Sequence, residues 1–139
     1  MKIWYGYSSE HSMNLVMIGR FSDAGDAAKA KQVIDWLTEQ VDADVNSQLM
    51  TIGNPAERYT NGMADLFRKV ELYSIGPVEL EQFAYDVTIE IEGNQIVVKT
   101  DEIDVSAFLK VLLDMGARVE VYSAHHYPGT GYGRGESVR

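Results

Sequence analysis

The pattern of hydrophobic residues near the start of the chain predicts strands. In residues 2–7, Ile3, Tyr5 and Tyr7 alternate with Trp4 and Gly6, a strand pattern that is rich in aromatic side chains. Residues 14–21 predict a second strand, in which Leu15 to Ile18 are apolar on both faces. This second pattern is typical of a central strand that is covered on both sides. Each of the two apolar faces of this strand therefore needs its own cover.

Helical spacing of apolar residues follows these strands. Residues 23–42 predict one long amphipathic helix, with Ser22 or Asp23 as its N-cap. An insertion over about residues 44–85 then predicts two shorter helices, the first of them capped by Thr60 or Asn61 and the second beginning at Pro77. The second short helix is expected to bury three apolar residues, Val78, Leu80 and Phe83.

The clearest hairpin of the chain lies just after this insertion. Residues 87–92 alternate Val and Ile with Thr and Glu, and residues 95–100 are rich in β-branched residues. Between them, Gly93 and Asn94 form a two-residue turn of the kind that joins antiparallel strands. One face of this hairpin must be polar, since its first strand places Thr and Glu at every second position.

The last predicted elements are a helix and a strand. Asp101 or Asp104 is expected to cap the helix, and Gly116 stands where a left-handed residue would end it. Residues 117–123 predict the final strand. Residues 124–139 contain glycine at every second position from 129 to 135, which predicts a flexible Gly-rich C-terminal tail.

The order strand, helix, hairpin, helix, strand resembles the ferredoxin-like split βαβ arrangement. We therefore predict a single α+β domain over residues 1–123, an antiparallel sheet with its two main helices on one face, an extra N-terminal strand and the helical insertion. In such a sheet the strand over residues 14–21 is central. Its second apolar face could be covered by residues 2–7, by the helices of residues 63–83, or by a second copy of the chain in a homodimer.

Charge divides the chain unevenly. The formal net charge is −9 at pH 7, which disfavours nucleic acid and membrane as direct partners because both attract clustered Lys and Arg. Residues 71–104 hold nine acidic residues and one basic residue, Lys99. Such a stretch is typical either of a solvated face that keeps a small domain soluble or of a surface that meets a basic partner. The candidate binding residues are Glu71, Glu79, Glu81, Glu90, Glu92 and Glu102.

The composition also limits the chemistry. The chain has no cysteine, which excludes disulfides, thiol catalysis and cysteine zinc sites and fits a reducing compartment. Its longest aliphatic run, residues 15–18, is too short to span a bilayer, so we expect a cytoplasmic protein. The glycines of the tail do not match the dinucleotide fingerprint, and no Gly-Lys-Ser or Gly-Lys-Thr phosphate loop occurs. We expect no cofactor.

The histidines offer an alternative site. If the last strand pairs antiparallel with residues 14–21, the residues before one strand lie near those after the other. Imidazoles and a carboxylate gathered there could bind a divalent metal, from Glu10, His11, His125 and His126. The alternative catalytic set, with an imidazole as general base, is His11, His125 and Tyr127. Ordinary surface histidines explain the same residues, because no metal-ligand spacing occurs among them.

Three functions fit these patterns. The first is a small acidic protein-binding module, such as an inhibitor or immunity-type protein that masks a basic, nucleic-acid-binding partner. The second is a dimeric α+β small-molecule-binding protein or enzyme with a His- and Tyr-lined pocket. The third is a structural or regulatory subunit that docks through its apolar sheet face. The acidic stretch and the lack of a catalytic motif favour the first, a protein that is not an enzyme.

Overall fold

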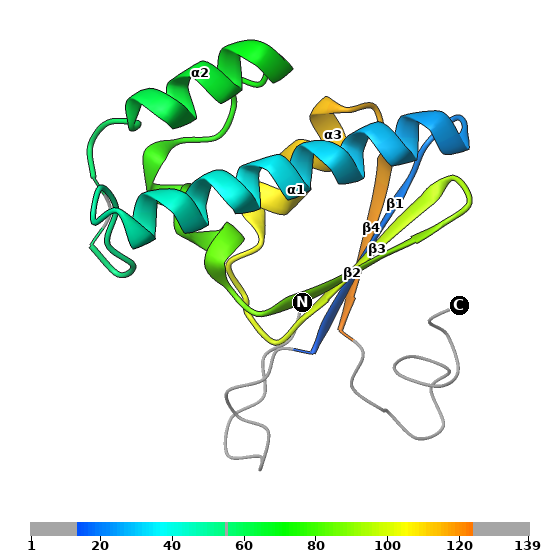
Figure 1. The fold of residues 1–139 in the computed structure, drawn as a ribbon. Helices are drawn as coiled ribbons and strands as arrows, with labels where there is room; N and C mark the ends of the chain where they lie inside the picture. Colours follow the sequence, from blue (N-terminus) through cyan, green and yellow to red (C-terminus); the bar gives the residue numbers. More distant parts are fainter. Residues whose placement is uncertain (1–13, 55, 124–139) are drawn as a thin grey trace, which may run out of the picture.

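A computed structural model describes residues 14–54 and 56–123 of the 139-residue chain. The predicted strand over residues 2–7 and the predicted tail over residues 124–139 lie outside the described residues. The described residues form eight elements, coloured in chain order in Figure 1. They are β1 (Leu15–Arg20), α1 (Ala24–Asn46), α2 (Asn61–Val70), the 3₁₀ helix η1 (Pro77–Ala84), β2 (Val87–Glu92), β3 (Gln95–Thr100), α3 (Ser106–Asp114) and β4 (Arg118–Ser123).

The four strands form one antiparallel sheet in the order β2-β3-β1-β4. The prediction of an α+β fold with an antiparallel sheet is confirmed, and β1 is a central strand as its two apolar faces indicated. Ile18 pairs with Val97 of β3 on one side and with Glu120 of β4 on the other. The finer assignment to the ferredoxin-like class stays a prediction.

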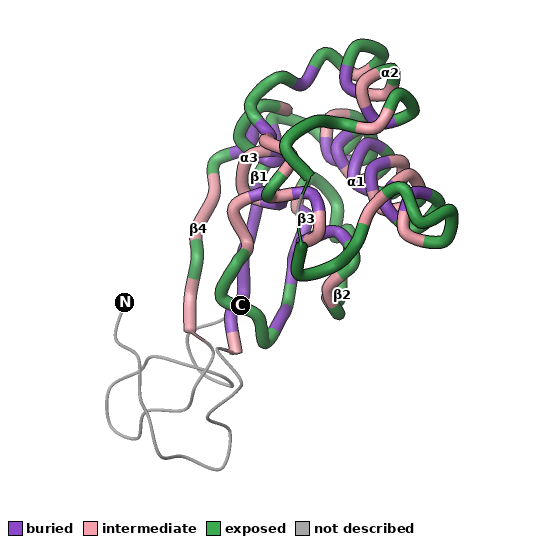
Figure 2. Tube along the Cα trace, turned by 90° about the vertical axis from the view of Figure 1, so that its left-hand side faces the viewer, coloured by how far each residue is buried: buried purple, intermediate pink, exposed green. Residues whose placement is uncertain are grey.

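The helices lie together on one side of the sheet (Figure 1). Met17, Ile96 and Val98 point to that side and share the main hydrophobic core with buried residues of α1, α2, η1 and α3. Figure 2 shows buried stretches of the chain along β1, β3 and α1. The helices of residues 63–83 belong to this core. They therefore do not cover the opposite sheet face, which removes one of the three covers that the sequence allowed.

The long helix begins where its sequence predicted. Asp23 is the N-cap, and its Oδ1 accepts a hydrogen bond from the Asp26 backbone N–H at 2.8 Å. The helix runs on to Asn46, one turn beyond the predicted end. That extra turn carries Asp44, a buried residue with 4% of its surface exposed. The helical spacing of apolar residues stops at Val41 and so suggested an end near residue 42, but the contact of Asp44 with Thr60 of the insertion keeps this turn helical.

The predicted cap of the last helix is wrong. Neither Asp101 nor Asp104 caps α3, whose N-cap is Val105 with no side-chain hydrogen bond. The free amide of Ala107 in the first turn instead donates to the Gln82 side-chain Oε1 at 2.7 Å, so η1 supplies the missing acceptor. The helix terminates as predicted, with Gly116 at a positive φ of 98°.

The second helix of the insertion buries fewer residues than expected. Leu80 and Phe83 are buried, as predicted, but Val78 is 64% exposed. This element is a 3₁₀ helix with three residues per turn, so Leu80 and Phe83 eclipse each other on one side. Val78 is off that line and faces solvent. The prediction that Val78 is buried is therefore wrong.

Candidate functional site

Two linkers run side by side at one end of the hairpin. The first enters β2 and the second leaves β3, at the paired residues Val87 and Thr100. The Thr100 hydroxyl donates to the Asp86 carbonyl oxygen at 3.3 Å and accepts from the Glu102 backbone N–H at 3.1 Å. Because Thr100 joins both linkers, the exposed acids Asp86, Asp101 and Glu102 are held at the same end of the sheet.

Tyr85 lies at the same end of the sheet, close to three acids: Glu81, Glu102 and Asp104. Its hydroxyl donates to Glu81 Oε2 at 2.9 Å. Burial, this hydrogen bond and the negative charges of Glu81, Asp104 and Glu102 raise the pKa of Tyr85 to about 12. The pKa of this phenol therefore depends on acids from two segments, η1 and the loop before α3. We call this surface the acidic edge; its acids, around Tyr85, are Glu81, Asp86, Asp101, Glu102 and Asp104.

The acidic edge also exposes an apolar side chain. Ile103 lies between the acids Glu102 and Asp104 and is 46% exposed. An exposed Ile within a charged surface resembles the composition of protein interfaces, where an apolar contact is surrounded by polar groups. On the η1 side, Gly53 donates its N–H to Glu81 Oε1 at 3.3 Å, which holds that carboxylate in place.

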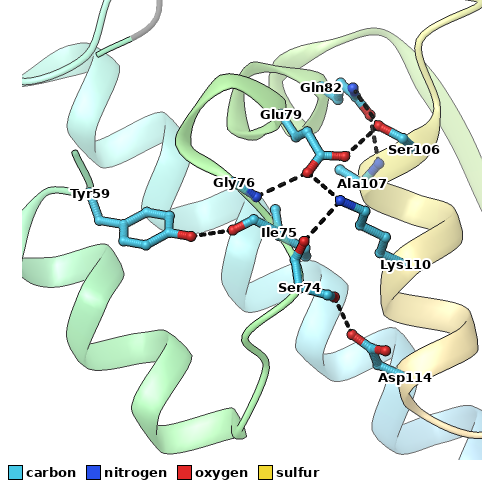
Figure 3. A network of polar contacts seen from close by, with 10 residues as sticks. All are labelled: Tyr59, Ser74, Ile75, Gly76, Glu79, Gln82, Ser106, Ala107, Lys110 and Asp114. Carbon is cyan, nitrogen blue, oxygen red and sulfur yellow. Dashed lines mark hydrogen bonds and ion pairs between the residues drawn. The ribbon is translucent and has the colours of Figure 1, made fainter. Parts of the chain in front are cut away.

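Glu79 is not part of this edge, although the sequence analysis counted it as a binding residue. Its Oε1 accepts from the Gly76 backbone N–H at 2.9 Å and from Lys110 Nζ at 2.7 Å. Its Oε2 accepts from the Ser106 hydroxyl at 2.6 Å (Figure 3). Burial alone would raise the pKa of Glu79, but these hydrogen bonds and the Lys110 charge lower it.

The contacts of Glu79 extend into a network between η1 and α3 (Figure 3). Gln82 Nε2 donates to the Ser106 hydroxyl at 3.1 Å, and Lys110 Nζ donates to the Ser74 carbonyl oxygen at 2.8 Å. The Ser106 hydroxyl is thus both a donor and an acceptor within the network. Its acceptor is a carboxylate with a lowered pKa, which is a weak base. This arrangement fixes η1 against α3 rather than activating a nucleophile.

The remaining predicted binding residues lie elsewhere. Glu71 follows α2 in a left-handed conformation, with φ of 59°. Glu90 and Glu92 are exposed on β2, on the sheet face away from the helices, since Ile89 between Thr88 and Glu90 packs into the main core. Of the six predicted acids, only Glu81 and Glu102 therefore belong to the acidic edge.

The sequence pattern does not single out the centre of this site. Beyond the charge of the segment, it assigns no role to Tyr85 or Asp86, and it offers Asp101 and Asp104 only as caps of the last helix. The available signal was a single tyrosine with acids on both sides in the sequence. Its importance depends on the β2–β3 pairing, which brings residues 81 and 102 to the same tyrosine.

The alternative metal and catalytic residues cannot be placed in this structure. They lie outside the described residues: Glu10, His11, His125, His126 and Tyr127. The strand pairing on which that hypothesis rested is confirmed, because Leu15 at the start of β1 pairs with Ser123 at the end of β4. Within residues 14–54 and 56–123, no group of three or more His, Asp or Glu residues could hold a metal ion.

An open depression lies at the start of α2, with a volume of about 380 Å³. Tyr59, Thr60 and Arg58 contribute to its lining, together with Leu49. A small cavity of about 20 Å³ beside Asp44 and Met50 has room for about one water molecule. Neither space is an enclosed apolar pocket of the size that small-molecule ligands usually occupy.

No helix in the described part of the chain is both long and apolar enough to cross a membrane.

Comparisons with known proteins place the chain in a family. No curated protein and no solved structure matches the sequence. One family does match, over residues 1–134, which is nearly the whole chain. The chain therefore belongs to the family of unknown function DUF6375.

Proposed function

We propose that this chain is an acidic protein-binding module that docks onto a basic surface of a partner protein. The observation that carries the proposal is the acidic edge, where acids from two separate segments surround Tyr85 and raise its pKa. A cluster of like charges attracts a basic partner and speeds the encounter. The exposed Ile103, between Glu102 and Asp104, supplies an apolar contact within the cluster.

An inhibitor or immunity-type role follows from this chemistry. Carboxylates on a rigid sheet end can occupy the places that phosphates would take on a nucleic-acid-binding protein, and so mask its basic surface. Such a protein needs no cofactor and no catalytic group, and it acts in the cytoplasm beside its partner. Glu79 is left out of the proposed surface, because its carboxylate is already bound by Lys110 and Ser106.

The test compares two variants of equal charge. The edge variant combines Asp86→Asn, Glu102→Gln and Asp104→Asn. The control variant combines Glu39→Gln, Asp42→Asn and Glu57→Gln, which are also exposed acids. Tagged full-length wild-type chain is used to capture proteins from a lysate of its own host. Each captured protein is then purified and its Kd measured for the wild type and both variants at low and high salt.

We expect one basic protein to bind the edge variant about tenfold more weakly than the wild type. Three rim ion pairs of about 0.5 kcal/mol each sum to roughly one factor of ten. The control variant should bind within about twofold of the wild type. Added salt should weaken wild-type binding, because it screens exposed charges. Equal affinities for both variants, or binding that ignores salt, would refute the proposal.

A small-molecule or metal site near the histidines is the second candidate, and the β1–β4 register favours it. Leu15 and Ser123 are paired, so the segments that carry His11 and His125 leave the sheet at neighbouring positions. Isothermal titration with Zn²⁺ tests this candidate in the full chain. Binding that disappears in both the His11→Ala and the His125→Ala variants would support it, and unchanged or absent binding would exclude a shared site.

We also propose that the fold is of the ferredoxin-like split βαβ type with a helical insertion. Without α2 and η1, the chain order is β1, α1, β2, β3, α3 and β4, which supports the proposal. The common packing of α1 and α3 into the main core supports it further. An experimental structure whose closest structural relatives belong to another fold class would overturn it.

A further inference from the structure

A second apolar cluster lies on the sheet face turned away from the helices. It consists of Val16, Ile18 and Val97, which are 4%, 2% and 6% exposed, with Tyr122 packed against it. The strand register explains why they meet: Ile18 pairs with Val97, and Val16 pairs with Tyr122. We call this surface the open face.

The described helices do not cover the open face. All of them pack into the other core, on the opposite side of β1 and β3 (Figure 1). The long side chains that flank the cluster on the sheet, Glu90 and Lys99, are themselves exposed. Among the described residues, Tyr122 is the hydrophobic side chain that packs onto the cluster. An uncovered sheet face does not normally bury three aliphatic residues to a few per cent.

Two segments outside the described residues adjoin the sheet and could cover the open face without a partner: the chain before β1 and the chain after β4. Both segments start beside the open face, because Leu15 pairs with Ser123 one position away from Val16 and Tyr122.

We propose that residues 2–7 pack across the open face and complete the second core. Their alternation places Ile3, Tyr5 and Tyr7 on one side, which matches an apolar surface. The connecting residues 8–14 reach about 24 Å when extended. Four strands spaced about 4.8 Å apart span only about 15 Å, so this reach is sufficient. The residues after Pro128 are rich in glycine and have fewer apolar groups to offer.

The absence of cysteine makes a direct test simple. The Val97→Cys variant has a single thiol, placed on the open face, and its reaction rate with a thiol reagent reports the cover. The N-terminal variant adds Ile3→Ser, Tyr5→Ser and Tyr7→Ser to it. A matched tail variant instead adds Tyr127→Ser, Tyr132→Ser and Val138→Ser. Ile96→Cys, on the helix side, reports whether the main core stays folded.

We expect the thiol at position 97 to react at least tenfold faster in the N-terminal variant than in the variant with an unaltered N-terminus. The tail variant should leave the rate unchanged, and the thiol at position 96 should stay protected throughout. Three results would overturn the proposal: acceleration by the tail variant alone, a rate that rises on dilution as for a dimer, or fast labelling with the N-terminus unaltered.

A second measurement leaves residues 2–7 unaltered, in case the serine substitutions unfold the chain. A nitroxide label is attached to the Thr88→Cys variant, at an exposed position on the open face. We expect this label to broaden the backbone NMR signals of residues 2–7. The broadening should be the same with and without an excess of unlabelled chains. A label on the Glu39→Cys variant, on α1, should not broaden them. Broadening that appears only between different chains, or equally from both labels, would refute the proposal.

Discussion

Glu79 joins η1 to α3 through its contacts with Ser106 and Lys110. Three donors bind its carboxylate, and its side chain is only 18% exposed. Glu79→Gln removes the charge from these hydrogen bonds, so we expect a loss of about 1–3 kcal/mol in the free energy of unfolding. Urea denaturation at pH 7 measures it. The exposed Glu39→Gln variant is the control and should change this free energy by less than about 0.5 kcal/mol.

The same residue should make stability depend on pH. Because the folded state lowers the pKa of Glu79 below its usual 4.5, its contribution is complete above that value. The contribution is lost as pH falls through the lower, folded pKa. The stability difference between the wild type and Glu79→Gln should therefore be constant from pH 7 to about 5.5 and shrink below pH 4.5. A difference that grows on acidification would contradict this assignment.

Glu79 also shows why a site residue is hard to predict from sequence. Among the acids of residues 71–104, nothing in the sequence distinguishes it from Glu81 or Glu102. Its role comes from Lys110, which lies 31 positions later and meets it only because α3 packs against η1. A local charge count can show that a segment is acidic. It cannot show which carboxylates the fold has already neutralised.

At the scale of elements, the junction between α1 and α2 depends on one threonine. Thr60 caps α2 by accepting from the Met63 backbone N–H at 3.1 Å, and it donates to Asp44 Oδ2 at 2.7 Å. Thr60→Val keeps the shape but loses both hydrogen bonds, and it leaves the buried Asp44 with Gln40 as its remaining side-chain donor. We expect a loss of about 2–3 kcal/mol in the free energy of unfolding, measured by chemical denaturation.

Two further variants separate the hydroxyl from the methyl group of Thr60. Thr60→Ser retains the hydroxyl and should restore most of the stability. Thr88→Val makes the same change at an exposed strand position and should alter the free energy of unfolding by less than about 0.5 kcal/mol. If Thr60→Ser were as unstable as Thr60→Val, packing of the methyl group, and not the cap, would hold the junction.

Elements with a long, regular pattern were predictable, and those that depend on a neighbour were not. The period of two in the hairpin and the capping Asp23 of α1 placed those elements within a few residues. The cap predicted for α3 was wrong because Gln82, from another element, accepts the hydrogen bond of the first-turn amide of Ala107. The 3₁₀ geometry of η1 could not be predicted either, since eight residues hold too few turns to distinguish a helical period of 3.0 residues from one of 3.6.

At the scale of the whole molecule, the insertion belongs to the main core. Met63 and Phe67 of α2 are buried in the same cluster as Met17 and Val98 of the sheet. A short helix whose buried residues belong to a core shared with the sheet has little stability on its own. The insertion and the sheet should therefore unfold together, although the sequence analysis treated residues 44–85 as an addition to a smaller domain.

Trp36 can test this cooperativity, because Lys69 Nζ of α2 lies 4.4 Å from the centre of its ring on α1. In a Trp4→Phe variant, Trp36 is the sole tryptophan, and its fluorescence reports the contact between α1 and α2. We expect its urea midpoint to coincide with that of far-UV circular dichroism, as in two-state unfolding. Adding Met63→Ala, which leaves a cavity, should cost about 2–5 kcal/mol and move both midpoints together. A fluorescence transition that precedes the loss of ellipticity would show that α2 separates from a sheet domain that is stable without it.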